Sequence, residues 1–303
     1  MSQNMLQLVQ QVTAELNLAI PNYVAGNPSQ DTQQILALMN GAGYELLKEY
    51  DWQALQVQYR FYTQSLTANA TTVNGSYNLT FDPSTDLSNV DSQWQLSGYN
   101  IPQDTYVVSA NNTSKVVVMS QMATGNGVQS VVCAQTAYNL PSDFETITDR
   151  TQWDKSKHWE MLGPEDAQQW QWLKSGYIST GPRVRWRILD GQFQIWPIMN
   201  TNEYLGWEYR SNAWARSASG SPQQQFLADT DTTVFDDRIL VLYTKMKYFQ
   251  VKSFDTTALM QDYQRYLSIA KANDKGAPNL SFAPQPSQVL IGWANIPDSN
   301  YGT

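Results

Sequence analysis

Few residues in this sequence are suited to nucleophilic or metal chemistry. Its 303 residues include one histidine, His158, and one cysteine, Cys133. A zinc site takes several His or Cys ligands, so no such site is expected. A Ser or Cys nucleophile needs a neighbouring base, and His158 is the one imidazole that could serve. Cys133 lies in a strand-like run that is typical of a small buried residue. We expect no catalytic residue, no metal ligand and no cofactor.

Paired carboxylates are the catalytic alternative that the sequence leaves open. A glycosidase needs two acids at the correct separation, and tryptophan rings offer flat apolar surfaces on which sugars stack. Several acids lie near tryptophans: Asp143, Glu145, Asp149, Asp154, Glu160, Glu165 and Asp166. Solvated or helix-capping acids are the simpler interpretation. A sugar-binding or glycan-cleaving protein therefore stays an alternative hypothesis.

The run Asp229-Thr230-Asp231 resembles the start of a calcium-binding loop. The sixth position of such a loop is glycine and the twelfth is glutamate, whereas this chain has Val234 and Leu240 there. We expect the two acids to cap and charge the start of the next helix instead, where the helix dipole favours them. The sequence also lacks the glycine-rich motifs of nucleotide-binding loops.

The composition and net charge of the chain indicate which kinds of partner it can bind. The chain is 42% hydrophobic, which supports a folded core, and its formal net charge is -8. An acidic protein is a poor binder of the phosphate backbone, because that affinity depends on Lys and Arg releasing counterions. The protein could still surround DNA without binding it. We see no signal peptide at the N-terminus and no apolar run long enough to span a membrane.

Tryptophan is concentrated in the middle of the chain, where eight of the eleven fall between residues 140 and 228. Aromatic side chains bury large apolar areas and anchor interfaces. We expect most of them to be core or subunit-contact residues. The tryptophans proposed for an interface are Trp153, Trp159, Trp170, Trp172, Trp207, Trp214 and, near the C-terminus, Trp293.

An arginine stripe lies in the same region. Arg183, Arg185 and Arg187 alternate with apolar residues in a predicted hairpin over 183–196, whose turn is Asp190-Gly191. The three arginines would share one face of a strand. A solvated face or a subunit contact is the simpler interpretation, and a stripe facing DNA is the alternative.

Helical patterns occupy both ends of the chain. Residues 1–58 contain two apolar stripes at helical spacing, and Asn27 followed by Pro28 predicts the start of the second helix. Residues 233–276 contain two more helices, with Thr233 and Asp236 as a capping box.

Strand patterns fill the middle of the chain. Period-two alternation over 59–137 predicts an inserted small antiparallel β module, and 138–232 reads as a Trp-rich β domain. Residues 277–303 carry four prolines and predict an extended arm. The predicted fold class is therefore α+β, with a helical bundle formed by both chain termini, a central antiparallel β domain and the inserted β module.

Several motifs together resemble a known family. They lie within roughly residues 1–272 and are Tyr50-Asp51-Trp52, the segments 94–102, 138–144 and 170–176, and Trp207-Glu208-Tyr209-Arg210-Ser211-Asn212. The chain resembles the head-to-tail adaptors of short-tailed bacteriophages, the tail tubular protein A-like family. These motifs are structural rather than catalytic, so the resemblance implies no enzyme activity.

The resemblance implies a virion protein of the neck or tail, made in the cytoplasm of the host bacterium. Such adaptors form a homo-oligomeric ring, usually of twelve copies, between the portal protein and the tail nozzle protein. The ring surrounds a channel through which genomic DNA passes without sequence-specific binding. The module at 59–137 is longer than a minimal adaptor needs, and tail fibres are a candidate partner for it. Another neck or tail structural protein is the alternative within this class.

Overall fold

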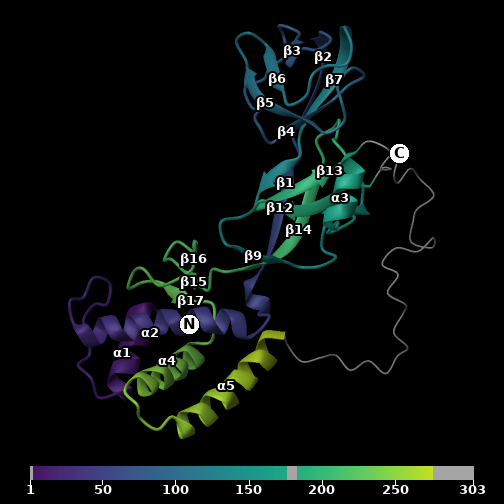
Figure 1. The fold of residues 1–303 in the computed structure, drawn as a ribbon. Helices are drawn as coiled ribbons and strands as arrows, with labels where there is room; N and C mark the ends of the chain where they lie inside the picture. The colour runs from purple at the N-terminus through teal and green to yellow at the C-terminus, as the bar shows by residue number, and fades with distance from the viewer. Residues whose placement is uncertain (1–2, 176–182, 276–303) are drawn as a thin grey trace, which may run out of the picture. The chain divides into compact units, whose positions relative to one another are not determined.

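The structure is a computed structural model that describes residues 3–175 and 183–275. The chain divides into two compact units, which are described one at a time (Figure 1). Unit 1 takes its described residues from 3–57, 142–147 and 209–275. Unit 2 takes its described residues from 58–141, 148–175 and 183–208. The predicted β domain at 138–232 is therefore shared between the two units.

The predicted fold class, a helical bundle built from both chain ends, is wrong. The described residues hold five α-helices against seventeen strands, and six of the strands close into a barrel. The apolar stripes of the terminal helices do need partners, but helices supply only some of them. Trp214, Phe226 and Phe235, which lie outside the helices, fill the centre of the core instead.

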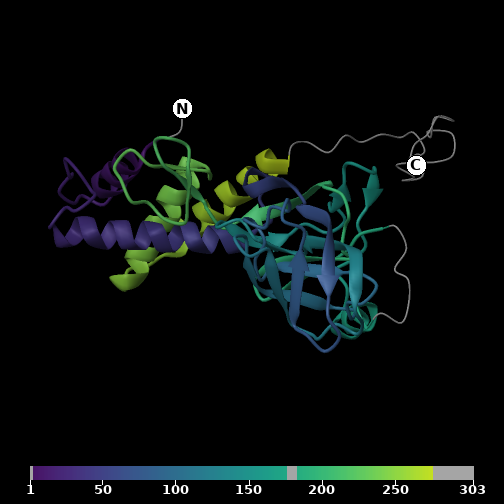
Figure 2. The same cartoon turned by 90° about the horizontal axis from the view of Figure 1, so that it is seen from above.

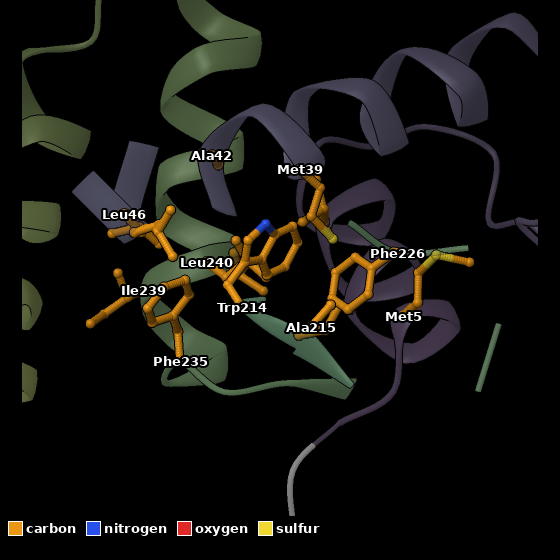
Figure 3. Close-up of a cluster of buried hydrophobic side chains, with 14 of the residues drawn as sticks. Met5, Met39, Ala42, Leu46, Trp214, Ala215, Phe226, Phe235, Ile239 and Leu240 are labelled. Carbon is orange, nitrogen blue, oxygen red and sulfur yellow. The ribbon is translucent and has the colours of Figure 1, made fainter. Parts of the chain in front are cut away.

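Unit 1 contains four of the α-helices and one 3-10 helix. They are α1 (Met5–Glu15), α2 (Gln30–Glu49), η1 (Gln53–Leu55), α4 (Asp237–Val251) and α5 (Thr257–Lys275). Helix α4 packs against α1, α2 and α5. Figure 3 shows residues of α1, α2 and α4 around the Trp214 ring. Burial of these apolar faces holds the helices in place, since short helices are marginal alone.

The helix starts follow local hydrogen bonding. In α1 the Asn4 and Gln7 side chains form a reciprocal capping box. The predicted start of α2 is wrong: Ser29 is the N-cap, and the Asn27 side chain accepts the Ser29 N–H at 2.9 Å, before the helix begins. Asn27 therefore shapes the turn that leads into the helix, and Pro28 lies outside the helix.

The predicted capping box of α4 is also wrong. Asp236 caps this helix by itself, accepting the N–H groups of Arg238 and Ile239. Thr233 is the last residue of a short strand, and its hydroxyl accepts the Phe235 N–H at 3.0 Å. The strand pairing takes Thr233 out of reach of the helix.

The strands of unit 1 are short. They are β9 (Phe144–Ile147), β15 (Ala215–Arg216), β16 (Pro222–Gln223) and β17 (Thr232–Thr233). The last three form an antiparallel sheet in the order β16-β15-β17. Strand β9 pairs with the end of β14 (Tyr204–Ser211).

Unit 2 contains the barrel. Its strands are β2 (Ser65–Thr72), β3 (Asn78–Phe81), β4 (Trp94–Ser97), β5 (Thr105–Asn111), β6 (Val116–Met119) and β7 (Gly127–Gln135). They close in the order β2-β3-β6-β5-β4-β7, with every pair antiparallel. All six strands fall within the predicted 59–137 module. Inward residues such as Leu79, Val117 and Cys133 are fully buried, because strand side chains alternate between the two faces.

The rest of unit 2 is smaller sheets and one helix. The elements are β1 (Gln56–Tyr62), β8 (Ala137–Asn139), β10 (Trp153–Asp154), β11 (Trp159–Glu160), α3 (Ala167–Lys174), β12 (Arg185–Leu189) and β13 (Gln192–Trp196). The predicted hairpin is confirmed as β12–β13. Asp190 and Gly191 at its turn have φ values of 54° and 68°, as a two-residue hairpin turn requires.

Candidate interaction surfaces

Cys133 and His158, the two residues considered for nucleophilic chemistry, differ in their exposure to solvent. Cys133 is fully buried in the barrel, and burial raises the pKa of its thiol to about 12. The reactive thiolate is therefore scarce near neutral pH. His158 is an exposed residue with φ 59°, in the connection between β10 and β11. Across the described ranges, no group of three or more His, Cys, Asp or Glu side chains could hold a metal ion.

Two of the acids near tryptophans accept hydrogen bonds from within the chain. Asp143 accepts the Tyr209 hydroxyl at 2.7 Å and the Ser211 hydroxyl at 2.6 Å. Asp166 caps α3 by accepting the Gln169 N–H. These contacts stabilise local structure and account for both carboxylates without a substrate.

One pair of buried carboxylates does converge, and the sequence indicated only one of its members. Asp154 and Glu203 are 2% and 5% exposed. Burial, together with the nearby Glu203 charge, raises the pKa of Asp154 although backbone N–H groups oppose the shift. Burial also acts to raise the pKa of Glu203, but hydrogen bonds from Thr201 and Lys157 lower it. Glu203 also lies near tryptophans in the sequence, between Trp196 and Trp207, so the same criterion of proximity would have indicated it.

The acids of the Asp229-Thr230-Asp231 run do not cap the next helix, contrary to prediction. Asp229 Oδ1 accepts the Val24 and Ala25 N–H groups at 3.0 and 2.7 Å. Asp231 accepts two N–H groups within its own turn, at 2.7 and 2.8 Å. Asp236 already caps α4, which leaves these acids to stabilise loops.

The tryptophans proposed as interface anchors fall into two groups. Trp170, Trp207 and Trp214 are at most 1% exposed, so they pack inside the protein and offer no surface. Trp153 and Trp159 are half-buried, and Trp172 on α3 is exposed. Trp293 lies outside the described residues.

The arginine stripe is partly neutralised within the chain. Arg183 is exposed, and Arg187 on β12 is half-buried. Arg185 Nη1 lies 2.6 Å from Glu165 Oε1, in a pair whose side chains are 27% and 9% exposed. The stripe therefore does not present three equivalent cations to a polyanion.

Ion pairs tie the helices of unit 1 together. Glu15 on α1 accepts from Lys245 Nζ at 2.7 Å and from Arg238 Nη1 at 2.9 Å. Burial acts to raise the pKa of Glu15, but hydrogen bonds from Lys245, Gln11 and Arg238 outweigh it and lower the pKa to about 2. Glu45 on α2 binds Lys247 in the same way. These three cations of α4, Arg238, Lys245 and Lys247, are thus paired with acids of the same chain.

The most prominent surface feature of unit 1 is its exposed apolar side chains. Nine large ones are between 38% and 59% exposed: Ile20, Tyr23, Tyr44, Leu227, Val251, Phe254, Met260, Tyr266 and Ile269. Exposed apolar side chains mark an interaction site when they gather into a patch, whereas single ones are common on protein surfaces. The sequence did not mark most of these residues, because they belong neither to the helical stripes nor to the tryptophans. Several of them lie beside a stripe or in a connecting loop.

Two of these side chains border a hollow. It has a volume of about 730 Å³ and lies between α2 and the segment that follows β15. We call it the α2 hollow, and its lining is Asn40, Gly41, Tyr44, Pro222, Gln223, Gln224, Gln225 and Leu227. No lining residue carries a charge, and four of the eight carry side-chain amides that can donate and accept hydrogen bonds.

Searches of protein families and of curated proteins found no match to this chain. Among the residues that the structure describes, none of the helices combines the length and the apolar character needed to cross a bilayer.

Proposed function

We propose that this protein is a structural virion subunit, the head-to-tail adaptor of a short-tailed bacteriophage. It assembles as a homo-oligomeric ring between portal and tail nozzle and surrounds the DNA channel. The observation that carries the proposal is the set of large apolar side chains exposed on unit 1, together with the α2 hollow. A subunit that stayed a monomer would leave this area in water at a cost proportional to its size.

The charge of the chain supports the same proposal. Its net charge is -8, and several cations of unit 1 are bound to internal acids. A channel wall with few free cations lets DNA slide, because the phosphates find little to bind. The sequence motifs that resemble the adaptor family are our reason for proposing an adaptor rather than another neck or tail protein.

The mass of the purified protein, alone and with the portal protein of the same virus, tests the proposal. We expect a closed ring or a portal-bound ring, visible by native mass spectrometry and electron microscopy. A chain that stays monomeric at high concentration and does not bind portal would overturn it. A ring that binds elsewhere in the virion would favour another neck or tail protein.

Sugar binding is a second candidate, and the barrel favours it. Tyr99 is 94% exposed. The segment that carries it is held by Asn100, whose backbone N–H donates to Gln129 Oε1 at 3.1 Å and whose side chain donates to Thr72 Oγ1 at 3.2 Å. An exposed tyrosine ring on an anchored segment suits stacking on a neutral sugar. Glycan-array binding that is lost in Tyr99→Ala, with the fold intact, would support this candidate. A blank array would remove it.

A further inference from the structure

Strand β1 is a long strand with an uncovered edge. It ends its sheet, whose order is β1-β14-β10-β11, so β14 is its one partner among the described strands. The barrel has no free edge, and the segment 162–165 covers the outer edge of β12 through backbone hydrogen bonds. The other strands at sheet edges have at most four residues, whereas β1 has seven. A free edge of this length is a template for a further strand.

The free edge of β1 carries unused hydrogen-bonding groups. Successive residues of a strand point their N–H groups to opposite sides. The Thr63 N–H, just after β1, donates to Glu203 O on the β14 side at 2.8 Å. The N–H groups of Gln58, Arg60 and Tyr62 therefore point to the free edge, and we call them the edge amides. Free edges are usually protected by prolines and charges, but β1 has no proline and Arg60 is its one charge.

The aromatic side chains of β1 are incompletely covered. The Tyr59 ring lies 5.1 Å from the Trp207 ring, and the Phe61 ring lies 4.6 Å from that of Tyr138. No residue of β1 is fully buried, whereas five of the eight residues of β14 are. An added strand would cover these rings, because side chains of neighbouring strands pack side by side. The occupant that fits is an extended, largely uncharged segment.

The point where α5 ends lies next to the start of β1. Asp274 accepts the Gln53 and Ala54 N–H groups at 2.6 and 3.1 Å. These two residues belong to η1, which leads directly into β1. The end of α5 and η1 lie side by side in both views (Figures 1 and 2). The chain that follows α5 therefore starts beside this edge strand.

That following chain is long enough to reach the whole of β1. From Ala54 to Tyr62 the chain advances by eight residues, which span at most about 29 Å. From Lys275 to Val289 it advances by fourteen residues, which span about 46 Å when extended. This bound follows from the covalent chain alone.

We infer that residues 288–293 of the same chain pair with the free edge of β1 as an added strand. Residues 287–296 contain no proline and no charge. Within them Val289, Ile291 and Trp293 alternate, in a pattern typical of a strand. In this mode of recognition the main-chain hydrogen bonds give affinity and alternate side chains give specificity. The inference goes beyond the proposed ring and does not depend on it.

Hydrogen exchange of the full-length protein tests the pairing. The double variant Leu290→Pro/Ile291→Pro removes one donor to β1 in either register, because successive N–H groups point to opposite sides. We expect the edge amides to exchange roughly tenfold faster or more in this variant than in wild type. The β1 amides that face β14 should not change. Asn300→Pro, which lies beyond the run, is the matched control and should behave as wild type.

A peptide with the sequence of residues 286–296 provides a second measurement. Added to the double variant, it should slow exchange at the edge amides again. Edge amides that exchange equally fast in wild type and in the double variant would overturn the inference. Protection that disappears when wild-type protein is diluted would assign the strand to a neighbouring copy and overturn the pairing within one chain. Neither result bears on ring formation, which the mass measurements with portal decide.

Discussion

Trp214 lies at the centre of the unit 1 core, where it meets side chains from three separate parts of the chain (Figure 3). Its ring meets Phe226 edge to face at 4.8 Å and stacks on Phe235 at 6.3 Å. Gly43 of α2 lets the indole approach the helix backbone. A residue of this size, buried this completely, sets the spacing of the elements around it.

The two glycines of α2 give a matched pair of stability predictions. Gly43→Ala should destabilise the protein by about 1–3 kcal/mol, because a methyl group there overlaps the Trp214 ring. Gly41→Ala should stabilise the protomer by about 0.4–1 kcal/mol, because the site is open and alanine favours helix. Urea denaturation at a protein concentration below assembly measures both. Equal effects of the two substitutions would show that the Trp214 ring does not crowd Gly43.

Glu15 should make stability depend on pH in the acid range. Its pKa is lowered from 4.5 to about 2 in the folded protein. A lowered folded pKa means that its contribution is complete above the unfolded value and is lost as pH falls from about 4.5 toward 2. The difference in unfolding free energy between wild type and Glu15→Gln should therefore shrink over that interval. A difference that stays constant from pH 6 to pH 2 would show that the ion pairs contribute nothing.

Among the elements, those whose sequence signal is local could be predicted. Alternation and an Asp-Gly turn identify the β12–β13 hairpin, whose partners are a few residues apart. Closure of the barrel has no such local signal. Ser65 on β2 pairs with Ala134 on β7, and β7 pairs on its other edge with β4. Register between strands so far apart depends on the whole set of pairings. The helix starts predicted at Asn27 and Thr233 are wrong, because each side chain accepts an N–H group that lies before its helix begins.

The loop before α2 depends on a distant acid. Asp229 accepts the Val24 and Ala25 N–H groups and so fixes a segment about 200 positions away in the sequence. Asp229→Ala should cost about 1.5–3 kcal/mol, since hydrogen bonds to a charged group are lost. Faster amide exchange at Val24 and Ala25 would locate the effect. Asp31→Ala, an exposed acid in the first turn of α2, is the control and should leave that loop protected.

At the scale of the molecule, the hydrophobic side chains form separate cores. One core fills unit 1 around Trp214, and another fills the barrel. The sequence could not tell buried tryptophans from exposed ones, because composition does not show which rings other side chains cover. The surface that supports assembly in our proposal consists instead of single side chains in loops and beside helical stripes.

Separate cores predict separate responses to cavities. Leu79→Ala in the barrel and Leu240→Ala in unit 1 each remove a fully buried side chain and should cost about 2–5 kcal/mol. Hydrogen exchange should rise mainly in β2, β3 and β6 for the first and mainly in α1, α2 and α4 for the second. Uniform loss of protection across the chain in both variants would mean that the protein unfolds as a single cooperative unit.

The scarcity of charge in the barrel has a consequence for proteolysis. Between Arg60 and Arg150 the chain has one basic residue, Lys115. That lysine lies in the turn between β5 and β6, where its φ is 57° and its Nζ contacts Asn112 at 2.7 Å. Trypsin can therefore divide the barrel at one bond, and the paired strands would hold the two pieces together. If the two pieces stay together and the circular dichroism spectrum is unchanged, the cleaved bond would label this region and allow it to be followed through assembly.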